Sequence, residues 1–142
     1  MRADTLSPKK ITANNFKSYG CLIDYPQRKK AIQKKNLFKI VLKQHSKGWR
    51  IAYLVVRDRF IERIEQHPDS CESFEPVRGK GLLFVAKNTD RGCIACFYLD
   101  RPVILKKGVW HGVVTQTKEF DVKIVENNSV QCVYHPLKKR LC

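Results

Sequence analysis

The sequence lacks a run of about 20 apolar residues, the length that an α-helix needs to cross a bilayer. Its first ten residues, MRADTLSPKK, contain no apolar stretch of the kind found in secretory signal peptides. We therefore expect a cytoplasmic protein with no membrane partner, whose six cysteines are reduced thiols rather than disulfide bridges. The sequence also lacks internal repeats and low-complexity tracts.

Acidic residues are scarce: 13 Asp and Glu stand against 28 Lys and Arg, for a net charge of +15. Such a balance is typical of proteins that bind nucleic acids or other anionic surfaces. Residues 1–50 hold 13 basic and 2 acidic residues, whereas residues 51–135 hold 12 basic and 11 acidic residues. The excess charge therefore lies mainly at the N-terminal end, and the body of the chain is nearly neutral.

The densest basic stretch, residues 27–36 (QRKKAIQKKN), has no aromatic side chain between its charges. Proteins that bind single-stranded nucleic acid interleave aromatic side chains with basic ones, because bases stack on the aromatic rings. Binding to duplex phosphates needs no aromatic residues. We interpret Asp24–Asn36, which contains this stretch, as an exposed connection, and nucleic-acid binding through the basic N-terminal segment remains an alternative.

Short segments rich in Val, Ile, Phe and Tyr follow one another from residue 37 onward, separated by turn residues and without a long helical period. This pattern predicts an all-β sandwich, jelly roll or barrel. Before it, Ile11–Gly20 predicts a short helix with Thr12 as its N-cap and Gly20 as its stop. The predicted strands are Leu37–Lys43, Arg50–Arg57, Ile61–His67, Gly81–Ala86, Ile94–Leu99, Val103–Leu105, Gly112–Gln116, Phe120–Val125 and Val130–Tyr134.

We expect a single domain, since 142 residues of which 43% are hydrophobic suffice for one packed core. Within it, residues 1–36 form a basic segment whose short helix packs on the barrel. Residues 37–136 form the barrel, and residues 137–142 form a basic tail.

Cys93 and Cys96 have the CxxC spacing of some zinc sites, but no second such pair exists. Residues 93–99 (CIACFYL) have the composition of a strand, in which residues three apart point to opposite faces. We therefore interpret both as small buried hydrophobic residues rather than zinc ligands.

Two histidines, His67 and His111, stand at the ends of predicted strands, where β-barrels often carry binding sites. Alternation along the strand places Arg63, Glu65 and His67 on one face. Glu72 follows across a short turn, and His111 comes from another strand. Two carboxylates and two imidazoles suit zinc, nickel, manganese or iron, or a general acid and base. In the alternative interpretation, Glu65 pairs with Arg63 on a solvated face and the histidines are isolated.

Three stretches together resemble the ureidoglycolate lyase family, which is similar to cupins. ITANNFKSYG at 11–20 resembles the family's opening helix. EQHPDSCESFEP at 65–76 resembles the pattern E-R-H-P-x-x-x-Q-x-F-x-P, and KGVWH at 107–111 resembles G-x-W-H. The resemblance covers roughly residues 11–127 and implies a cupin-type double-stranded β-helix or jelly-roll barrel with a short N-terminal helix.

The resemblance also implies a reaction, the cleavage of the C–N bond of ureidoglycolate to glyoxylate and urea. It implies His67 and His111 as the groups that exchange protons, with Glu72 beside them as a third catalytic residue. It further implies a divalent metal ion, of nickel, zinc, manganese or iron, held by Glu65, His67, Glu72 and His111.

For a small anionic substrate, the resemblance implies contacts with Arg63, Lys107 and Trp110. It implies a homodimer as well. Two other functions remain open: a metal-binding cupin with another activity or none, and a protein that binds nucleic acid through residues 1–36.

Overall fold

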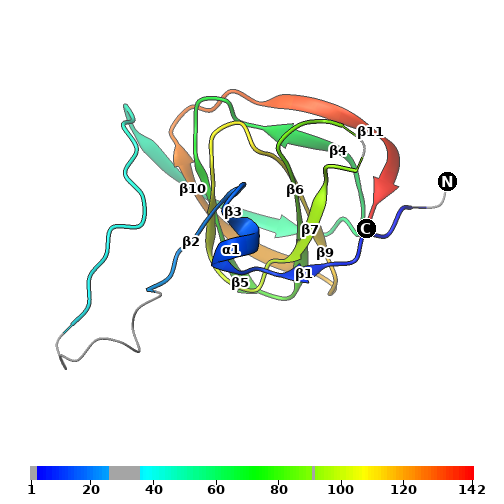
Figure 1. The fold of residues 1–142 in the computed structure, drawn as a ribbon, viewed down its shortest axis with the longest axis horizontal. Coiled ribbons are helices and arrows are strands. Elements are labelled where there is room, and N and C mark those ends of the chain that lie inside the picture. Colours follow the sequence, from blue (N-terminus) through cyan, green and yellow to red (C-terminus); the bar gives the residue numbers. More distant parts are fainter. Residues whose placement is uncertain (1–2, 26–35, 91) are drawn as a thin grey trace.

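The computed structural model describes residues 3–25, 36–90 and 92–142 (Figure 1). The basic stretch at 27–36, interpreted as an exposed connection with nucleic-acid binding as the alternative, lies largely outside these residues. No helix in the described ranges is long and apolar enough to span a membrane. The elements are β1 (Lys9–Lys10), α1 (Ala13–Phe16), β2 (Gly20–Leu22), β3 (Trp49–Val56), β4 (Ile61–Gln66), β5 (Glu72–Arg78), β6 (Gly81–Ala86), β7 (Ala95–Tyr98), β8 (Val103–Leu105), β9 (Trp110–Thr115), β10 (Phe120–Asn127) and β11 (Val133–Leu141).

Eight of the strands form two antiparallel sheets, in the orders β3-β10-β5-β8 and β4-β9-β6-β7. Consecutive strands from β3 to β10 alternate between the sheets, except that β6 and β7 are neighbours in one sheet, and this is the arrangement of a jelly roll with two Greek keys. β2 extends the first sheet, and β1 and β11 extend the second. The strands enclose a barrel (Figure 1). The predicted fold class, an all-β jelly-roll barrel of the cupin type with a short N-terminal helix, is confirmed.

The barrel interior holds the main hydrophobic core, because inward-facing residues of both sheets are apolar. The helix α1 is anchored in it by Phe16, whose ring lies 5.4 Å from that of Phe97. The predicted N-cap is present: the hydroxyl of Thr12 accepts a hydrogen bond from the amide of Asn15 at 3.1 Å. The helix has only four residues, so this packing rather than helix propensity holds it in place.

Gly20 does not end the helix, as the sequence predicted. The C-cap is Lys17, with an ordinary right-handed conformation, and Gly20 begins β2. A Cβ atom at Gly20 would lie 1.8 Å from the carbonyl oxygen of Ile104 on β8. The glycine is therefore needed for the close approach of β2 to β8.

We expect Gly20→Ala to lower the free energy of unfolding by about 3 kcal/mol, because the clash is with backbone and can be relieved only by moving a strand. Urea denaturation measures this effect. The control is Gly48→Ala, whose Cβ would lie at an ordinary 3.4 Å from the Asn128 side chain. Equal stability of the two variants would contradict this role for Gly20.

Residues 37–43 do not form the predicted strand. In the described part of the chain they pair with no other strand, and Phe38 is 85% exposed. Gln44, directly after them, accepts a hydrogen bond from the amide of Cys71 and bonds Asn127 through its own amide. These contacts hold the segment against the ends of β5 and β10. Although residues 37–43 have the apolar pattern of a strand, they do not lie at the edge of either sheet in the described part of the chain.

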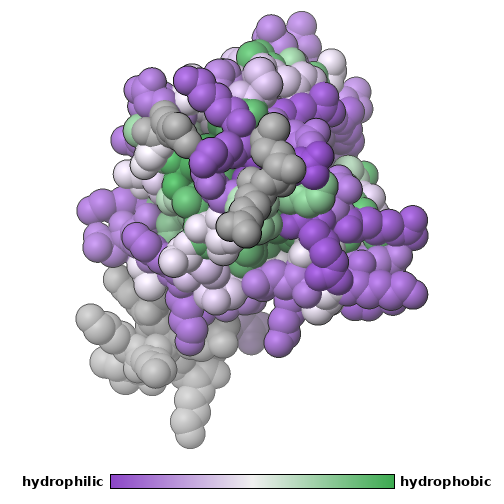
Figure 2. Space-filling view, turned by 90° about the vertical axis from the view of Figure 1, so that its right-hand side faces the viewer, coloured by the Kyte–Doolittle hydropathy of each residue, from purple (hydrophilic) through white to green (hydrophobic). Residues whose placement is uncertain are grey.

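Two further differences concern β5, which the sequence did not predict, and β11, which is longer than predicted. β5 was not predicted, because its Glu, Ser and Pro residues resemble a loop and only Phe74 among residues 72–76 is a typical strand residue. β11 begins at Val133 and continues through Leu141, so residues predicted as a tail pair with β4. The β11 side of the molecule is dominated by hydrophilic side chains, with hydrophobic atoms visible between them (Figure 2).

The six cysteines are free, as expected for reduced thiols. Cys96 is buried in β7, as predicted, but Cys93 is exposed in the turn before that strand. The prediction that both are buried was therefore wrong for Cys93, because β7 begins two residues after it.

Candidate metal centre

Three buried side chains from three strand ends meet inside the barrel: His67 after β4, Glu72 at the start of β5 and His111 on β9. They are 5%, 6% and 3% exposed. Oε2 of Glu72 lies 3.0 Å from Nε2 of His111 and 3.2 Å from Nε2 of His67. The two sheets thus bring together residues that are far apart in the chain, in a group whose ligand atoms all lie within 4.8 Å of one another.

The turn before β9 fixes the two histidines relative to each other. Gly108 has a φ of +74°, which favours glycine, and its amide donates to the carbonyl of His67 at 2.9 Å. Because Gly108 is three residues before His111, this hydrogen bond holds the start of β9 against the end of β4. On the other side, the Asp69 carboxylate accepts from the amide of Gln131 at 3.2 Å and holds that residue beside His67.

Backbone carbonyls fix the tautomer of both rings. Nδ1 of His67 lies 3.1 Å from the carbonyl oxygen of Gln131, and Nδ1 of His111 lies 3.0 Å from that of Val109. Because a carbonyl can only accept, each Nδ1 carries the proton, and in a neutral ring Nε2 presents its lone pair to Glu72. Metal-binding histidines are held in this way in most proteins.

The donor atoms fit a divalent metal ion. Oε2 of Glu72 and Nε2 of His111 are buried and have no partner in a hydrogen-bonding direction, although they lie only 3.0 Å apart. Buried polar atoms without partners are costly. Ligands that share an ion at about 2.1 Å lie roughly 3 Å apart when the angle between them is near 90°. Two imidazole nitrogens and a carboxylate oxygen suit the borderline transition metals.

Without a metal, the three groups form a charged cluster. The Glu72 carboxylate, 3.2 Å from Nε2 of His67, favours the protonated ring and raises the pKa of His67 to about 9, against the opposing effect of burial. Burial favours the neutral form of Glu72, but the two imidazoles outweigh it and lower the pKa of the carboxyl to about 2. Burial likewise opposes charge on His111, and the Glu72 carboxylate nevertheless raises its pKa. A metal ion must therefore displace protons from these rings.

Glu65 lies at the rim of this group. Its Cα pairs with that of His111 across β4 and β9, and Oε1 lies 3.7 Å from Nε2 of that histidine. Its side chain is 37% exposed. The structure thus brings together all four residues of the predicted ligand set, with three buried and Glu65 partly open to solvent.

Sequence reasoning missed Cys132. Its Sγ lies 3.6 Å from Nδ1 of His67, and Glu65, His67 and Cys132 form a second group whose ligand atoms all lie within 4.8 Å of one another. Nothing local marks Cys132, since it reaches the site only because β11 pairs with β4, with Tyr134 opposite Glu65. The two groups share His67, with Cys132 beside its Nδ1 and Glu72 beside its Nε2.

We expect Cys132→Ser to keep the metal affinity within about threefold, because the thiol lies beside Nδ1 of His67, which already donates to Gln131. Competition with a chromophoric chelator measures the affinity. A loss of more than about tenfold would assign the ion to the group that contains Cys132 instead.

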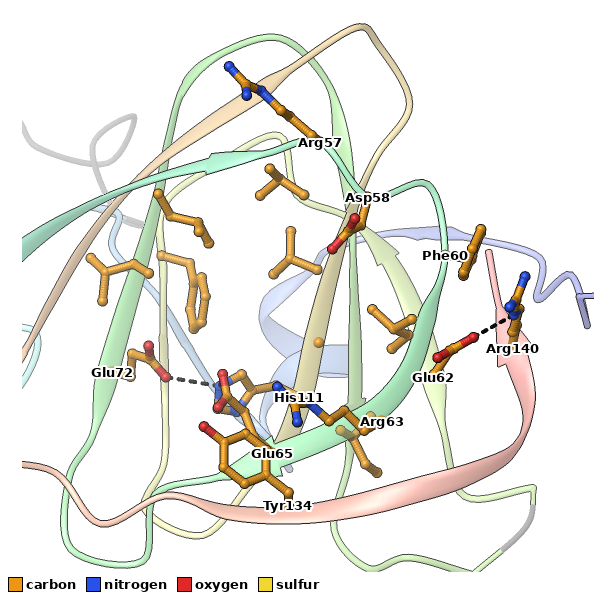
Figure 3. A pocket seen from close by; sticks show the side chains of 18 of the residues that line it. Arg57, Asp58, Phe60, Glu62, Arg63, Glu65, Glu72, His111, Tyr134 and Arg140 are labelled. Carbon is orange, nitrogen blue, oxygen red and sulfur yellow. Dashed lines mark ion pairs between the residues drawn. The ribbon is translucent and has the colours of Figure 1, made fainter.

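The site opens into a pocket of about 670 Å³ (Figure 3). Arg63, one of the predicted substrate contacts, lines it, and its guanidinium lies 4.5 Å from the centre of the Tyr134 ring. Lys107 is exposed on the turn before β9 and does not line this pocket. Trp110 packs with Ile64 on the opposite face of the sheet, because it precedes His111 in an alternating strand. The structure therefore brings only Arg63 of these three to the site.

The sequence matches no protein-family model and no curated protein. Among solved structures it is similar to oxalate decarboxylase from Bacillus subtilis, including the enzyme at pH 4.6 and one studied for its Mn(II) centres. Both show 17% identity and a TM-score of 0.48 over 64% of this chain. The matched part is 24% of the length of those chains. At this distance the likeness says nothing about activity, and the fold assignment rests on the strand order.

Proposed function

We propose that the protein is a metal-dependent cupin that acts on a small carboxylate. The observation that carries this proposal is the convergence of two imidazole nitrogens and a carboxylate oxygen, from His67, His111 and Glu72, with both Nδ1 atoms already bonded to carbonyls. Glu65 lies beside these three ligands at the rim, 3.7 Å from Nε2 of His111, and its carboxylate would stay free of the ion. A divalent ion held there supplies a Lewis acid and lowers the pKa of oxygen ligands bound to it.

Arg63 is the residue that would bind the substrate's carboxylate. It lines the pocket beside Glu65, and in the described ranges it forms no ion pair, only the stacking contact with Tyr134. A guanidinium offers paired donors that match the two oxygens of a carboxylate. The stacking on Tyr134 holds the guanidinium plane in one orientation, which reduces the conformational entropy lost on binding.

The lyase reaction that the resemblance implies needs a base for the substrate hydroxyl and an acid for the departing urea nitrogen. His67 and His111 can exchange protons in the metal-free protein, but as metal ligands they would be occupied. Glu65, with a partly exposed carboxylate at the rim, is then the group placed to accept a proton. We propose Glu65 as the general base of this reaction, with ureidoglycolate as the first compound to test.

The test is glyoxylate release from ureidoglycolate by protein reconstituted separately with zinc, nickel, manganese and iron. We expect turnover with at least one metal, none in His111→Ala, and full turnover in His45→Ala, which removes an exposed histidine in a loop. Circular dichroism and the urea midpoint show that the barrel is intact. Metal uptake without glyoxylate would reject the lyase activity and leave a metal-binding cupin with another substrate. Full activity of His111→Ala would reject the site itself.

A further inference from the structure

The pocket beside the metal centre has an apolar wall that the proposed chemistry does not use. Five inward-facing apolar side chains from four strands line it: Leu54 and Val56 on β3, Phe74 on β5, Val113 on β9 and Ile124 on β10. Figure 3 shows Glu72, His111 and Glu65 at one end of the pocket and Arg57 with Asp58 at the other. The wall between these polar ends is therefore apolar.

Strand register places these residues in layers above the metal centre. Glu126 on β10 lies opposite Glu72 and Arg50, at the level of the site. Two residues along β10, Ile124 lies opposite Phe74. Leu54 belongs to the next layer and Val56 to the last one. Val56 is six residues from Arg50 along β3, so the layers extend over about 20 Å at the rise of an extended strand.

Leu54 shows that this wall is open to a ligand. It faces the barrel interior, as do its neighbours Ala52 and Val56, which pack on the core, yet it remains 37% exposed. Its exposed surface therefore faces the pocket. Apolar surface that a ligand removes from water contributes favourably to binding, by about 25 cal/mol per Å². A volume of about 670 Å³ lies within the range of small-molecule sites, which combine apolar walls with a few polar groups.

We propose that the pocket binds a carboxylate with an apolar body, its head at the metal centre and Arg63 and its body along the layers from Phe74 to Val56. The position of the head rests on the proposed function, whereas that of the body rests on the wall alone. A ligand that is polar throughout, such as ureidoglycolate, would leave this wall in water. Compounds with an apolar body therefore bind more tightly than polar ones of the same charge.

The test is calorimetric titration of the zinc-loaded protein with straight-chain carboxylates from acetate to decanoate. Each added methylene that reaches the wall is expected to tighten binding about three- to fourfold, until the chain exceeds the pocket. Affinity that does not change with chain length would overturn the proposal.

Leu54→Gln is expected to weaken decanoate binding at least tenfold and to reduce the gain per methylene. The matched control is Ile51→Gln, on the same strand but on the outer face of the sheet, where Ile51 is 60% exposed. Equal loss in both variants would overturn the assignment of the body to this wall. Metal uptake by Leu54→Gln shows that its barrel is folded.

Metal analysis of the same samples separates the two proposals. If metal binds and affinity does not depend on chain length, the apolar body is rejected and the metal centre stands. If no metal binds, the proposed function is rejected, and the chain-length series on the metal-free protein still decides the apolar body.

Discussion

Glu72→Gln is expected to weaken metal binding by more than a hundredfold. The carboxylate oxygen lies 3.0 and 3.2 Å from the two imidazole Nε2 atoms, so it is central to the donor set, and an amide oxygen is neutral and a poorer ligand. Replacing a residue that merely orients a ligand already costs 10- to 100-fold in many sites. Competition with chelators of known affinity measures the change.

The control for this substitution is Glu75→Gln. Glu75 lies on the same strand but faces outward, where it pairs with Lys123 at 2.8 Å and is 44% exposed. We expect its metal affinity to equal that of the unmodified protein. An affinity of Glu72→Gln within tenfold of the Glu75→Gln value would show that Glu72 is not a ligand.

Metal affinity is also expected to rise at least a hundredfold between pH 6 and pH 8. The pKa of His67 in the metal-free protein is about 9, so binding must release its proton, and each pH unit below that value costs about tenfold. The raised pKa of His111 acts in the same direction. Calorimetry in buffers of different ionisation enthalpy, at both pH values, measures the affinity and the protons released. Binding that releases no proton would contradict this account.

The free energy of unfolding of the metal-free protein should fall at alkaline pH, where the metal binds more tightly. His67 has a raised pKa, so its contribution is present below about pH 6.5 and is lost as pH rises through about 9. Glu72 has a lowered pKa, so its contribution is present above about pH 4.5 and is lost as pH falls toward 2. Both contributions are complete between about pH 4.5 and 6.5. Metal-free and metal-loaded protein should therefore differ most in unfolding midpoint on the alkaline side of that range.

Local patterns in the sequence predicted most of the strands after residue 48, though not β5, and singled out the four clustered residues. Alternation along β4 put Glu65 and His67 on one face, and the bounds of β6 and β8 agree with the prediction. The same alternation separates Trp110 from His111, so the prediction of Trp110 as a pocket residue could have been avoided. A rule that acts within one strand thus carries most of the information about the site.

Contacts between distant segments could not be predicted. Cys132 and Gln131 reach His67 only through the pairing of β11 with β4, and no local signal gives the partner of a strand. Residues 37–43 have the pattern of a strand but no partner in the described part of the chain. Periodicity reports which side chains favour burial, whereas pairing depends on the whole topology.

The most direct test of the metal centre is anomalous scattering from a crystal of the protein grown with zinc or manganese. We predict a single anomalous peak within about 2.0–2.2 Å of Nε2 of His67, Nε2 of His111 and a carboxylate oxygen of Glu72. A peak at Sγ of Cys132, or no peak among these three side chains at full metal loading, would contradict the account.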